Sequence, residues 1–299
     1  MRFVERLVLS KSDQAIHVKC PAKVNLFLKV LGKRADGYHE VENVMQTVSL
    51  FDELTVQKGG AGLTLICSGE EVGVSTEENL AFRAAELFFK KGYGKGGVRL
   101  DLKKNIPVAA GLAGGSSDAA CCLLALNELF GSGLSSDDLR SLAAELGSDI
   151  PFFVEGGAAL CTGRGEVVRL LRSPFRFSGI LLAPEAQLKT TEMYSSLTPE
   201  DMQGPHVNEM LRSIQSGDLT KVCSGLFNSF ERAAFEKVPE LARLKTRLED
   251  LGSLGVVLCG SGPTLLGIFP DVGAAKAALH RLRADNKLKM RFAATIETF

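Results

Sequence analysis

A glycine-rich segment placed directly before an apolar helical pattern is the feature of this sequence best suited to chemistry. It reads IPVAAGLAGGSSDAACCLLALNELFG and runs from Ile106 to Gly131. The strand-like stretch GGVRLDLKKNI leads into it, so the glycines lie between a predicted strand and a predicted helix. Free N–H groups at a helix N-terminus, backed by the positive end of the helix dipole, bind anions such as phosphate. A purely structural glycine turn is the alternative that spacing alone leaves open.

The loop fits neither of the two commonest phosphate-binding fingerprints. A P-loop ends in Gly-Lys-Ser/Thr, whereas GGSSD contains no lysine, and a dinucleotide-binding loop needs GxGxxG after the first strand with an acid about 20 residues later. The remaining donors are backbone amides and the hydroxyls of Ser116 and Ser117, with a metal ion supplying the charge that a lysine supplies elsewhere. Asp118 either caps the helix or repels a phosphate, unless it turns away or a cation bridges the two groups.

Two ionisable residues far apart in the sequence suit proton transfer from an alcohol. Lys23 and Asn25 share one face of an alternating strand, and Asp149 follows a predicted helix in LGSDIPFF. If Lys23 met Asp149, the carboxylate would accept the proton, and the ammonium would keep the base ionised and stabilise growing negative charge. The alternatives are a solvated lysine and a turn or cap aspartate before proline.

A third group of residues suits recognition of a planar base. Tyr38 and His39, in the loop DGYHE, combine a stacking surface with a hydrogen-bonding edge, although a lone loop histidine is usually incidental. A second Gly-Ser-Gly turn lies in LCGSGPTLLGIF, Leu258 to Phe269, where an ordinary tight turn is the simpler interpretation. Asn79, in EENL, is by default the cap of its helix.

The elements that position these residues mix strands and helices. In VKCPAKVNLFLKV every second residue from Val24 to Val30 is apolar, which predicts a half-buried strand with one apolar face. Helix N-termini are predicted at a Ser/Thr start near Ser75 and at a capping box of Ser135 and Asp138, whose helix places Gly147 at C′. Further strands are predicted over residues 41–57, 61–69 and 96–106, and helices over 75–94, 117–130 and 135–147.

The second half of the chain repeats this mixture. The segment SDIPFFVEGGAALCTGRGEVVRLL predicts a strand pair. The sequence pattern changes near RSPFRFSG, where we place the boundary between two domains. A strand GILLAP, a helix-rich region over 190–251, strand segments over 255–269, a helix near VGAAKAALHRLRA and a final strand over 290–299 follow. We therefore predict two α+β domains, residues 1–172 and 173–299.

Composition narrows the class of partner. The 299 residues include 35 basic and 35 acidic side chains, so the formal net charge of zero provides no footprint for nucleic acid or an anionic membrane. Seven cysteines without a CxxC pair suggest neither disulfides nor zinc and favour reduced thiols in the cytoplasm. The N-terminal MRFVERLVLSKSDQ lacks the apolar region of a secretory signal, and no apolar run reaches membrane-spanning length. A small-molecule partner is expected.

The order and spacing of these motifs resemble the GHMP kinase superfamily. The strand PAKVNLFLKV, the loop GYH, the segment PVAAGLAGGSSDAA and the late turn GSGPTLL carry the resemblance, which covers the chain from about Cys20 to Phe269. It implies a two-domain α+β fold, with an ATP-binding domain resembling domain 2 of ribosomal protein S5 followed by a ferredoxin-like domain, and an active site between them. RADGYHE after PAKVNLFL is similar to members that use ATP to phosphorylate the C2 hydroxyl of a cytidine-diphosphate-linked methylerythritol in non-mevalonate isoprenoid precursor biosynthesis.

The resemblance also implies roles for individual residues. Asp149 would be the general base, assisted by Lys23, with Asn25 contacting the substrate and Tyr38 and His39 recognising the cytosine. Asn79 would lie near the adenine. The ATP phosphates would be bound by Pro107, Val108, Ala109, Ala110, Gly111, Leu112, Ala113, Gly114, Gly115, Ser116 and Ser117.

Some features of the expected site stay open at this point. Ala109 and Ala113 stand where many superfamily members have glycine, and alanine limits the backbone there to negative φ without excluding phosphate contact. Magnesium is expected with ATP, held by Ser117, by Asp118, or only by phosphates and water. The alternatives for function are another GHMP small-molecule kinase, of homoserine or mevalonate type, and a nucleotide-binding relative without turnover.

Overall fold

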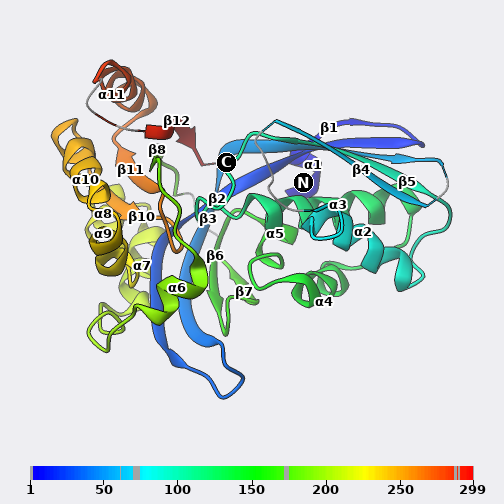
Figure 1. Cartoon of the computed structure of the whole chain (residues 1–299), viewed down its shortest axis with the longest axis horizontal. Helices are drawn as coiled ribbons and strands as arrows, with labels where there is room; N and C mark the ends of the chain where they lie inside the picture. The colour runs from blue at the N-terminus through cyan, green and yellow to red at the C-terminus, as the bar shows by residue number, and fades with distance from the viewer. Residues whose placement is uncertain are drawn as a thin grey trace.

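A long antiparallel hairpin connects the two halves of the molecule (Figure 1). It consists of strands β2 (Ala15–Lys33) and β3 (His39–Lys58). The computed structural model describes residues 3–60, 62–69, 75–171, 175–285, 288 and 290–298. Its strands form two sheets within these residues, and the predicted α+β class is confirmed.

The first sheet is built around this hairpin in the order β1-β2-β3-β5-β4. All pairs along this order are antiparallel except β4 with β5, which is parallel. A branch of β6 and β7 extends from β3, and the short β9 pairs with β2. The other strands of this sheet are β1 (Val8–Lys11), β4 (Leu63–Gly69), β5 (Val98–Lys104), β6 (Ala158–Thr162), β7 (Val167–Leu170) and β9 (Phe227–Asn228).

Helices of the N-terminal half cover one face of this sheet (Figure 1). They are α1 (Phe3–Leu7), α2 (Leu80–Lys90), α3 (Gly114–Phe130), α4 (Ser136–Leu146) and α5 (Phe152–Glu155). Helix α3 lies in the middle of the core, because it is apolar nearly all round and its residues from Ser117 to Leu126 are buried. The predicted burial of this helix is confirmed.

The second sheet is four-stranded and antiparallel, in the order β10-β11-β8-β12. Its strands are β8 (Ser178–Pro184), β10 (Gly255–Leu258), β11 (Leu265–Phe269) and β12 (Met290–Glu297). Helices α10 (Glu240–Asp250) and α11 (Val272–Ala284) pack on one face. The helix-rich middle of the chain is completed by α6 (Thr190–Ser195), α7 (Val207–Ser216), α8 (Leu219–Ser224) and α9 (Glu231–Lys237).

The predicted single apolar face of β2 is wrong. Register shifts follow Pro21, Asn25 and Val30, and each shift interrupts the alternation of side chains between the faces. Val24 consequently packs between the two sheets, whereas Val30 belongs to the core under α10 and α11. The strand is buried on both sides from Cys20 to Leu28, because the second half of the molecule covers the face that would otherwise meet water.

Local signals located several helix ends and missed others. The capping box of Ser135 and Asp138 is present, and Gly131 ends α3 with a left-handed backbone, φ 60°. Helix α2 begins at Leu80 rather than near Ser75, because the side chain of Asn79 caps it. Gly147 ends α4 with φ 171°, which is extended rather than left-handed. Within SDIPFFVEGG the backbone forms the short helix α5, and the strand pair begins only at β6.

The proposed boundary between residues 172 and 173 lies outside the described residues and stays a prediction. All seven cysteines are free, six of them buried. Of the helices described here, none combines the length and apolar character needed to cross a bilayer.

The start of α3 is strained in a way that the sequence did not indicate. Ala109 and Ala113 both have φ 55°, so the expected negative φ is wrong at both positions. For a residue with a Cβ this left-handed conformation costs about 1–2 kcal/mol. Both alanines lie in the nine residues that connect β5 to α3, and the packed surroundings of this loop hold the strained conformation in place.

Ala113→Val should lower the free energy of unfolding by about 1–3 kcal/mol, because a β-branched side chain tolerates the left-handed backbone poorly. Ala113→Gly should be at least as stable as the parent. Chemical denaturation followed by circular dichroism measures both, with the exposed helical Ala277→Val, expected to cost about 0.5 kcal/mol, as the control. Equal losses for Ala113→Val and Ala277→Val would contradict the strain.

Candidate active site

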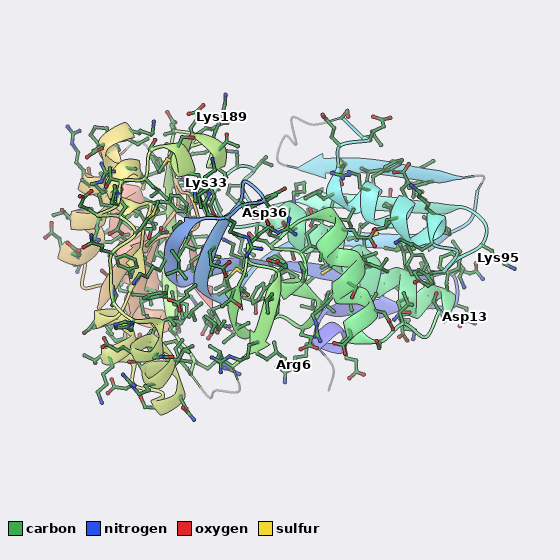
Figure 2. All side chains as sticks on the ribbon, turned by 90° about the horizontal axis from the view of Figure 1, so that it is seen from below. Arg6, Asp13, Lys33, Asp36, Lys95 and Lys189 are labelled. Carbon is green, nitrogen blue, oxygen red and sulfur yellow. The ribbon has the colours of Figure 1, made fainter. Side chains whose placement is uncertain are left out.

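The two sheets meet at a cleft of about 1210 Å³. Its walls come from β2, β3, the segment before α3, the turn after α4, the β10–β11 loop and α6. Lys33 and Lys189 line it. Figure 2 shows Lys33 and Asp36 toward the middle of the molecule and Lys189 at an edge of the C-terminal half, whereas Lys95 and Asp13 lie at the far end of the N-terminal half. Residues from both halves of the sequence therefore share one cavity.

The glycine-rich loop is held against the second half of the molecule by a close backbone approach. A Cβ built on Gly111 would lie 2.1 Å from the carbonyl oxygen of Cys259, so only glycine fits there. Arg291 of β12 donates a hydrogen bond to the carbonyl of Val108 (3.1 Å), and the amide of Lys23 donates to the carbonyl of Leu112 (3.1 Å). The loop is thereby fixed from both sheets.

Most of the residues expected to bind ATP line the cleft, but two do not. The side chain of Leu112 is 1% exposed and packs in the core between the sheets. Ser117 is fully buried, and its hydroxyl has no hydrogen-bond partner in the described structure. Asn79 lines the cleft while its Oδ1 accepts from the amide of Ala81 (2.9 Å), so its cap role is confirmed.

Lys23 and Asn25 form a buried hydrogen-bonded centre rather than a solvated edge. The ammonium of Lys23 is 3% exposed and donates to Asn25 Oδ1 (2.8 Å) and to the carbonyl of Gly111 (2.9 Å). Asn25 Oδ1 also accepts from the amide of Gly260 (2.7 Å), and its Nδ2 donates to Asn43 Oδ1 (2.7 Å). The side chain of Asn25 therefore connects β2, β3 and the turn between β10 and β11.

Asp149 reaches the same cleft from the turn after α4. It is partly exposed, and a Cβ built on Gly165 would lie 3.6 Å from its Oδ1. Neither a hydrogen bond nor an ion pair links Asp149 to Lys23 among the described residues, although the charges of both reach the buried thiol of Cys161. The structure thus brings the two residues to one cavity without pairing them directly.

Asp118 forms a buried ion pair with a lysine. Lys104, the last residue of β5, donates to Asp118 Oδ2 (2.6 Å) and also binds Asp52, and all three side chains are at most 5% exposed. Burial raises the pKa of Asp118 to about 7, and the charge of Lys104 opposes that rise. A lysine that is absent from the loop sequence therefore lies beside the loop in space, where its charge is shared between the two carboxylates.

Aromatic side chains form the other end of the cleft. Tyr38 is 53% exposed, and the guanidinium of Arg164 lies 4.6 Å from the centre of its ring. His39 stacks on Tyr194 with centroids 4.5 Å apart, and Tyr194 meets the edge of Phe230 at 4.9 Å. Partial burial and the charge of Lys33 lower the pKa of His39 below the 6.5 of an unperturbed histidine, so at pH 7 the ring is neutral.

Several residues of the cleft were not found from the sequence. Tyr194 lies on α6, about 150 residues from His39, and nothing local marks it as its partner. Asn43 and Lys104 are polar residues within strands, which pattern analysis assigns to a solvated face. For Asn43 and Lys104 the residue type was the only indication in the sequence of a role in the cleft. A buried amide or ammonium needs hydrogen-bond partners, and the linear sequence does not reveal which residues these are.

The fold and this cleft define a class of phosphotransferase. Residues 79–157 match the model of the GHMP kinases N terminal domain, and residues 210–288 match that of the GHMP kinases C terminal domain. The chain resembles a homoserine kinase structure from Cytophaga hutchinsonii with a TM-score of 0.75 over 97% of this chain and 96% of that one; at 18% identity this likeness concerns the fold alone. The chain is therefore a GHMP kinase.

Two further comparisons identify the family within the GHMP kinases to which the chain belongs. A protein of Bacillus cytotoxicus named 4-diphosphocytidyl-2-C-methyl-D-erythritol kinase is 43% identical over 84% of this chain and 87% of its own length. A crystal structure of 4-(cytidine 5'-diphospho)-2C-methyl-D-erythritol kinase is 37% identical, with a TM-score of 0.80 over 94% of this chain and 98% of that one. The chain belongs to the family of 4-diphosphocytidyl-2-C-methyl-D-erythritol kinases.

Replacing Lys33 with glutamine should raise the pKa of His39 toward 6.5, because the nearby positive charge that disfavours the imidazolium is removed. The imidazole would then take up its proton at a higher pH as the solution is acidified. NMR titration of the histidine ring protons, assigned with His39→Gln, measures this pKa. Lys95→Gln, at the far end of the molecule, is the control, and an unchanged His39 pKa in Lys33→Gln would contradict the attribution.

Proposed function

We propose that this protein uses ATP to phosphorylate the C2 hydroxyl of 4-diphosphocytidyl-2-C-methyl-D-erythritol, in non-mevalonate isoprenoid precursor biosynthesis. The observation that carries the proposal is the 43% identity to a kinase of that name over 84% of the chain. The cleft agrees with it chemically, because a backbone loop suited to phosphates and an aromatic end suited to a base flank one carboxylate, Asp149.

The nucleotide would occupy the end of the cleft formed by the loop from Pro107 to Ser117. The free amides at the start of α3 face the cleft through Gly114, Gly115 and Ser116, where they would bind the phosphate oxygens. Asn79 would lie near the adenine. The carbonyls of Val108, Gly111 and Leu112 are already hydrogen-bonded within the protein, so they hold the loop rather than the ligand.

Asp149 would act as the general base at the centre. Its carboxylate takes the proton of the C2 hydroxyl as that oxygen attacks the γ-phosphorus and the bond to the bridging oxygen of ADP breaks. Lys23 has two of its three N–H groups committed, to Asn25 and Gly111, which leaves one for the reacting oxygens. Its positive charge would stabilise the negative charge that develops during transfer.

The hydrogen bonds that Asn25 already makes within the protein limit how it could contact the substrate. Its Oδ1 accepts from Lys23 and Gly260, and one of its two amide protons is donated to Asn43. One N–H remains for a ligand. We therefore assign Asn25 chiefly to positioning Lys23, with at most a single donated hydrogen bond to the acceptor.

The cytidine end of the acceptor would bind at the aromatic end of the cleft. Tyr38 offers an exposed ring for stacking, and Tyr194 adds a second ring beside His39. Because His39 is neutral at pH 7, one ring nitrogen donates and the other accepts a hydrogen bond, which suits the polar edge of a cytosine. Arg164 brings positive charge to the same end, where the substrate carries a diphosphate.

Magnesium would accompany ATP, and the residues beside the loop fit a hard cation. Asp118 lines the cleft, and its Oδ1 has no hydrogen-bond partner in the described structure; carboxylate oxygens are among the ligands that Mg²⁺ prefers. Ser117 Oγ is also without a partner there, but Ser117 is fully buried and does not line the cleft. When bound, the ion neutralises charge on the phosphates. We also place the protein in the cytoplasm, with no nucleic acid among its partners, on the basis of its free thiols and its zero net charge.

Asp149→Asn should lower kcat about 10²–10⁴-fold, the typical contribution of a general base, while ATP binding stays within about threefold. ADP release with Mg²⁺ and the cytidine-linked acceptor measures turnover, and calorimetry measures nucleotide affinity. Asp101→Asn, on the outer face of the first sheet beside Arg99, is the control and should keep full activity.

Undiminished turnover in Asp149→Asn would remove Asp149 from this role. A parent protein that ignores the cytidine-linked acceptor but phosphorylates homoserine, mevalonate or another alcohol would refute the substrate while leaving a GHMP kinase. ATP binding without any ADP release would favour the relative without turnover.

A further inference from the structure

A buried charge cluster lies beneath the phosphate-facing loop, and the mechanism above does not use its deepest member. Asp52 of β3 is fully buried and binds Lys104, which in turn donates to Asp118 of α3. Lys104 and Asp118 line the cleft, whereas Asp52 lies behind them. A carboxylate that is removed from solvent but touches two strands and a helix requires a specific reason, because burying it is costly.

The second oxygen of Asp52 holds the entrance of the loop. Its Oδ1 accepts from the backbone amides of Asn105 (2.6 Å) and Ile106 (2.8 Å), the two residues that precede Pro107. The side chain of Asn105 adds a bond to the carbonyl of Phe51, next to Asp52 in the chain (2.9 Å). Bonds from a backbone amide to an ionised carboxylate are shorter and stronger than neutral ones. The loop thus leaves β5 in a direction set by this carboxylate.

Asp52 also lies against the start of helix α3. A Cβ built on Gly114 would lie 3.1 Å from Asp52 Oδ2, so the first residue of the helix passes close to the carboxylate. Through Lys104 the same oxygen is connected to Asp118, the fifth residue of the helix. The side chain of Asp52 therefore contacts the entry of the loop. It also contacts the start of helix α3, where the loop ends, both directly and through Lys104.

We propose that Asp52 is a positioning residue for the nucleotide: its two oxygens set the distance between the entry of the phosphate loop and the start of helix α3. Oδ1 anchors Asn105 and Ile106, and Oδ2 anchors Lys104, which also binds Asp118 on the wall of the cleft. The amides of Gly114 and Gly115 are then held in one orientation before ATP arrives, so that binding costs no reorganisation of the loop. This inference rests on the nucleotide half of the proposed function.

An amide cannot replace this carboxylate. Asparagine has one acceptor oxygen and one donor NH₂, whereas the site presents two amide donors on one side and an ammonium donor on the other. Whichever way the amide turns, two donors face each other. Asp52→Asn therefore changes one atom and breaks one of the two anchors.

The experiment compares Asp52→Asn and Asp52→Ala with the parent. We expect ADP affinity, measured by calorimetry without acceptor, to weaken at least fivefold to tenfold, and KM for ATP to rise by a similar factor. KM for the acceptor should stay within about threefold, because its end of the cleft does not touch this cluster. If Asp52→Ala does not fold, the nearly isosteric Asp52→Asn decides, with circular dichroism verifying the fold of each variant.

The control is Asp201→Asn. Asp201 is also a buried carboxylate, 9% exposed, that accepts from a backbone amide, that of Thr198 (2.8 Å), and binds a cation, Arg232, but it does not line the cleft. It should lose stability with no change in ADP affinity. Unchanged ADP affinity in folded Asp52→Asn, an equal rise in both KM values, or the same loss in Asp201→Asn would overturn the proposal. Because ADP binding needs no acceptor, a wrong acceptor would not affect this result.

Discussion

The hydrogen bonds of Asn25 join the two halves of the cleft, and the rest of the site depends on them. Its oxygen accepts from Lys23 on its own strand and from Gly260 in the turn of the second sheet, while its nitrogen donates to Asn43 on the neighbouring strand. The side chain is fully buried, so each of these bonds forms without competition from water. Lys23 is consequently held against Gly111, and the loop, the strand and the second sheet take one relative position.

The end of the cleft that we propose for the phosphates combines backbone dipoles with buried side-chain charge. The loop has no lysine of its own, and the left-handed Ala109 and Ala113 show that the chain accepts strain to bring its amides to the cleft. Lys104 supplies positive charge from the end of β5, but two carboxylates surround it. A cluster of this kind contributes position more than attraction, because one ammonium shared by two carboxylates leaves no excess positive charge to attract a phosphate.

The end that we propose for the acceptor is built differently, from rings on separate elements. Tyr38 and His39 come from the turn of the long hairpin, Arg164 from the β6–β7 turn, and Tyr194 from α6 in the second half of the chain. Both ends share Asp149, which reaches the cleft from the turn after α4. A phosphoryl donor and a base-linked acceptor would thus approach one carboxylate from opposite sides, which is the arrangement that direct transfer requires.

Sequence patterns identified many of the residues and elements of this site, but not which of them contact one another. The strand-loop-helix order around the glycines, the buried α3, the cap at Asn79 and the capping box at Ser135 followed from local rules, because each depends on neighbours within a few residues. The alternation in β2 misled, because bulges and a second covering layer are properties of the folded chain. The negative φ expected of two alanines was wrong for the same reason, since packing around the loop outweighs a preference of about 1–2 kcal/mol.

The sequence by itself determined the α+β class, the loop that suits a phosphate and the residue types able to move a proton or stack on a base. Only the tertiary structure decided that Lys23 is buried and bound to Asn25, that Lys104 binds Asp118, and that Tyr194 stacks on His39. The physical reason is that local signals arise from backbone geometry over a few residues. Partners for a buried charge or ring come from strands and helices that meet only when the two sheets pack around one cleft.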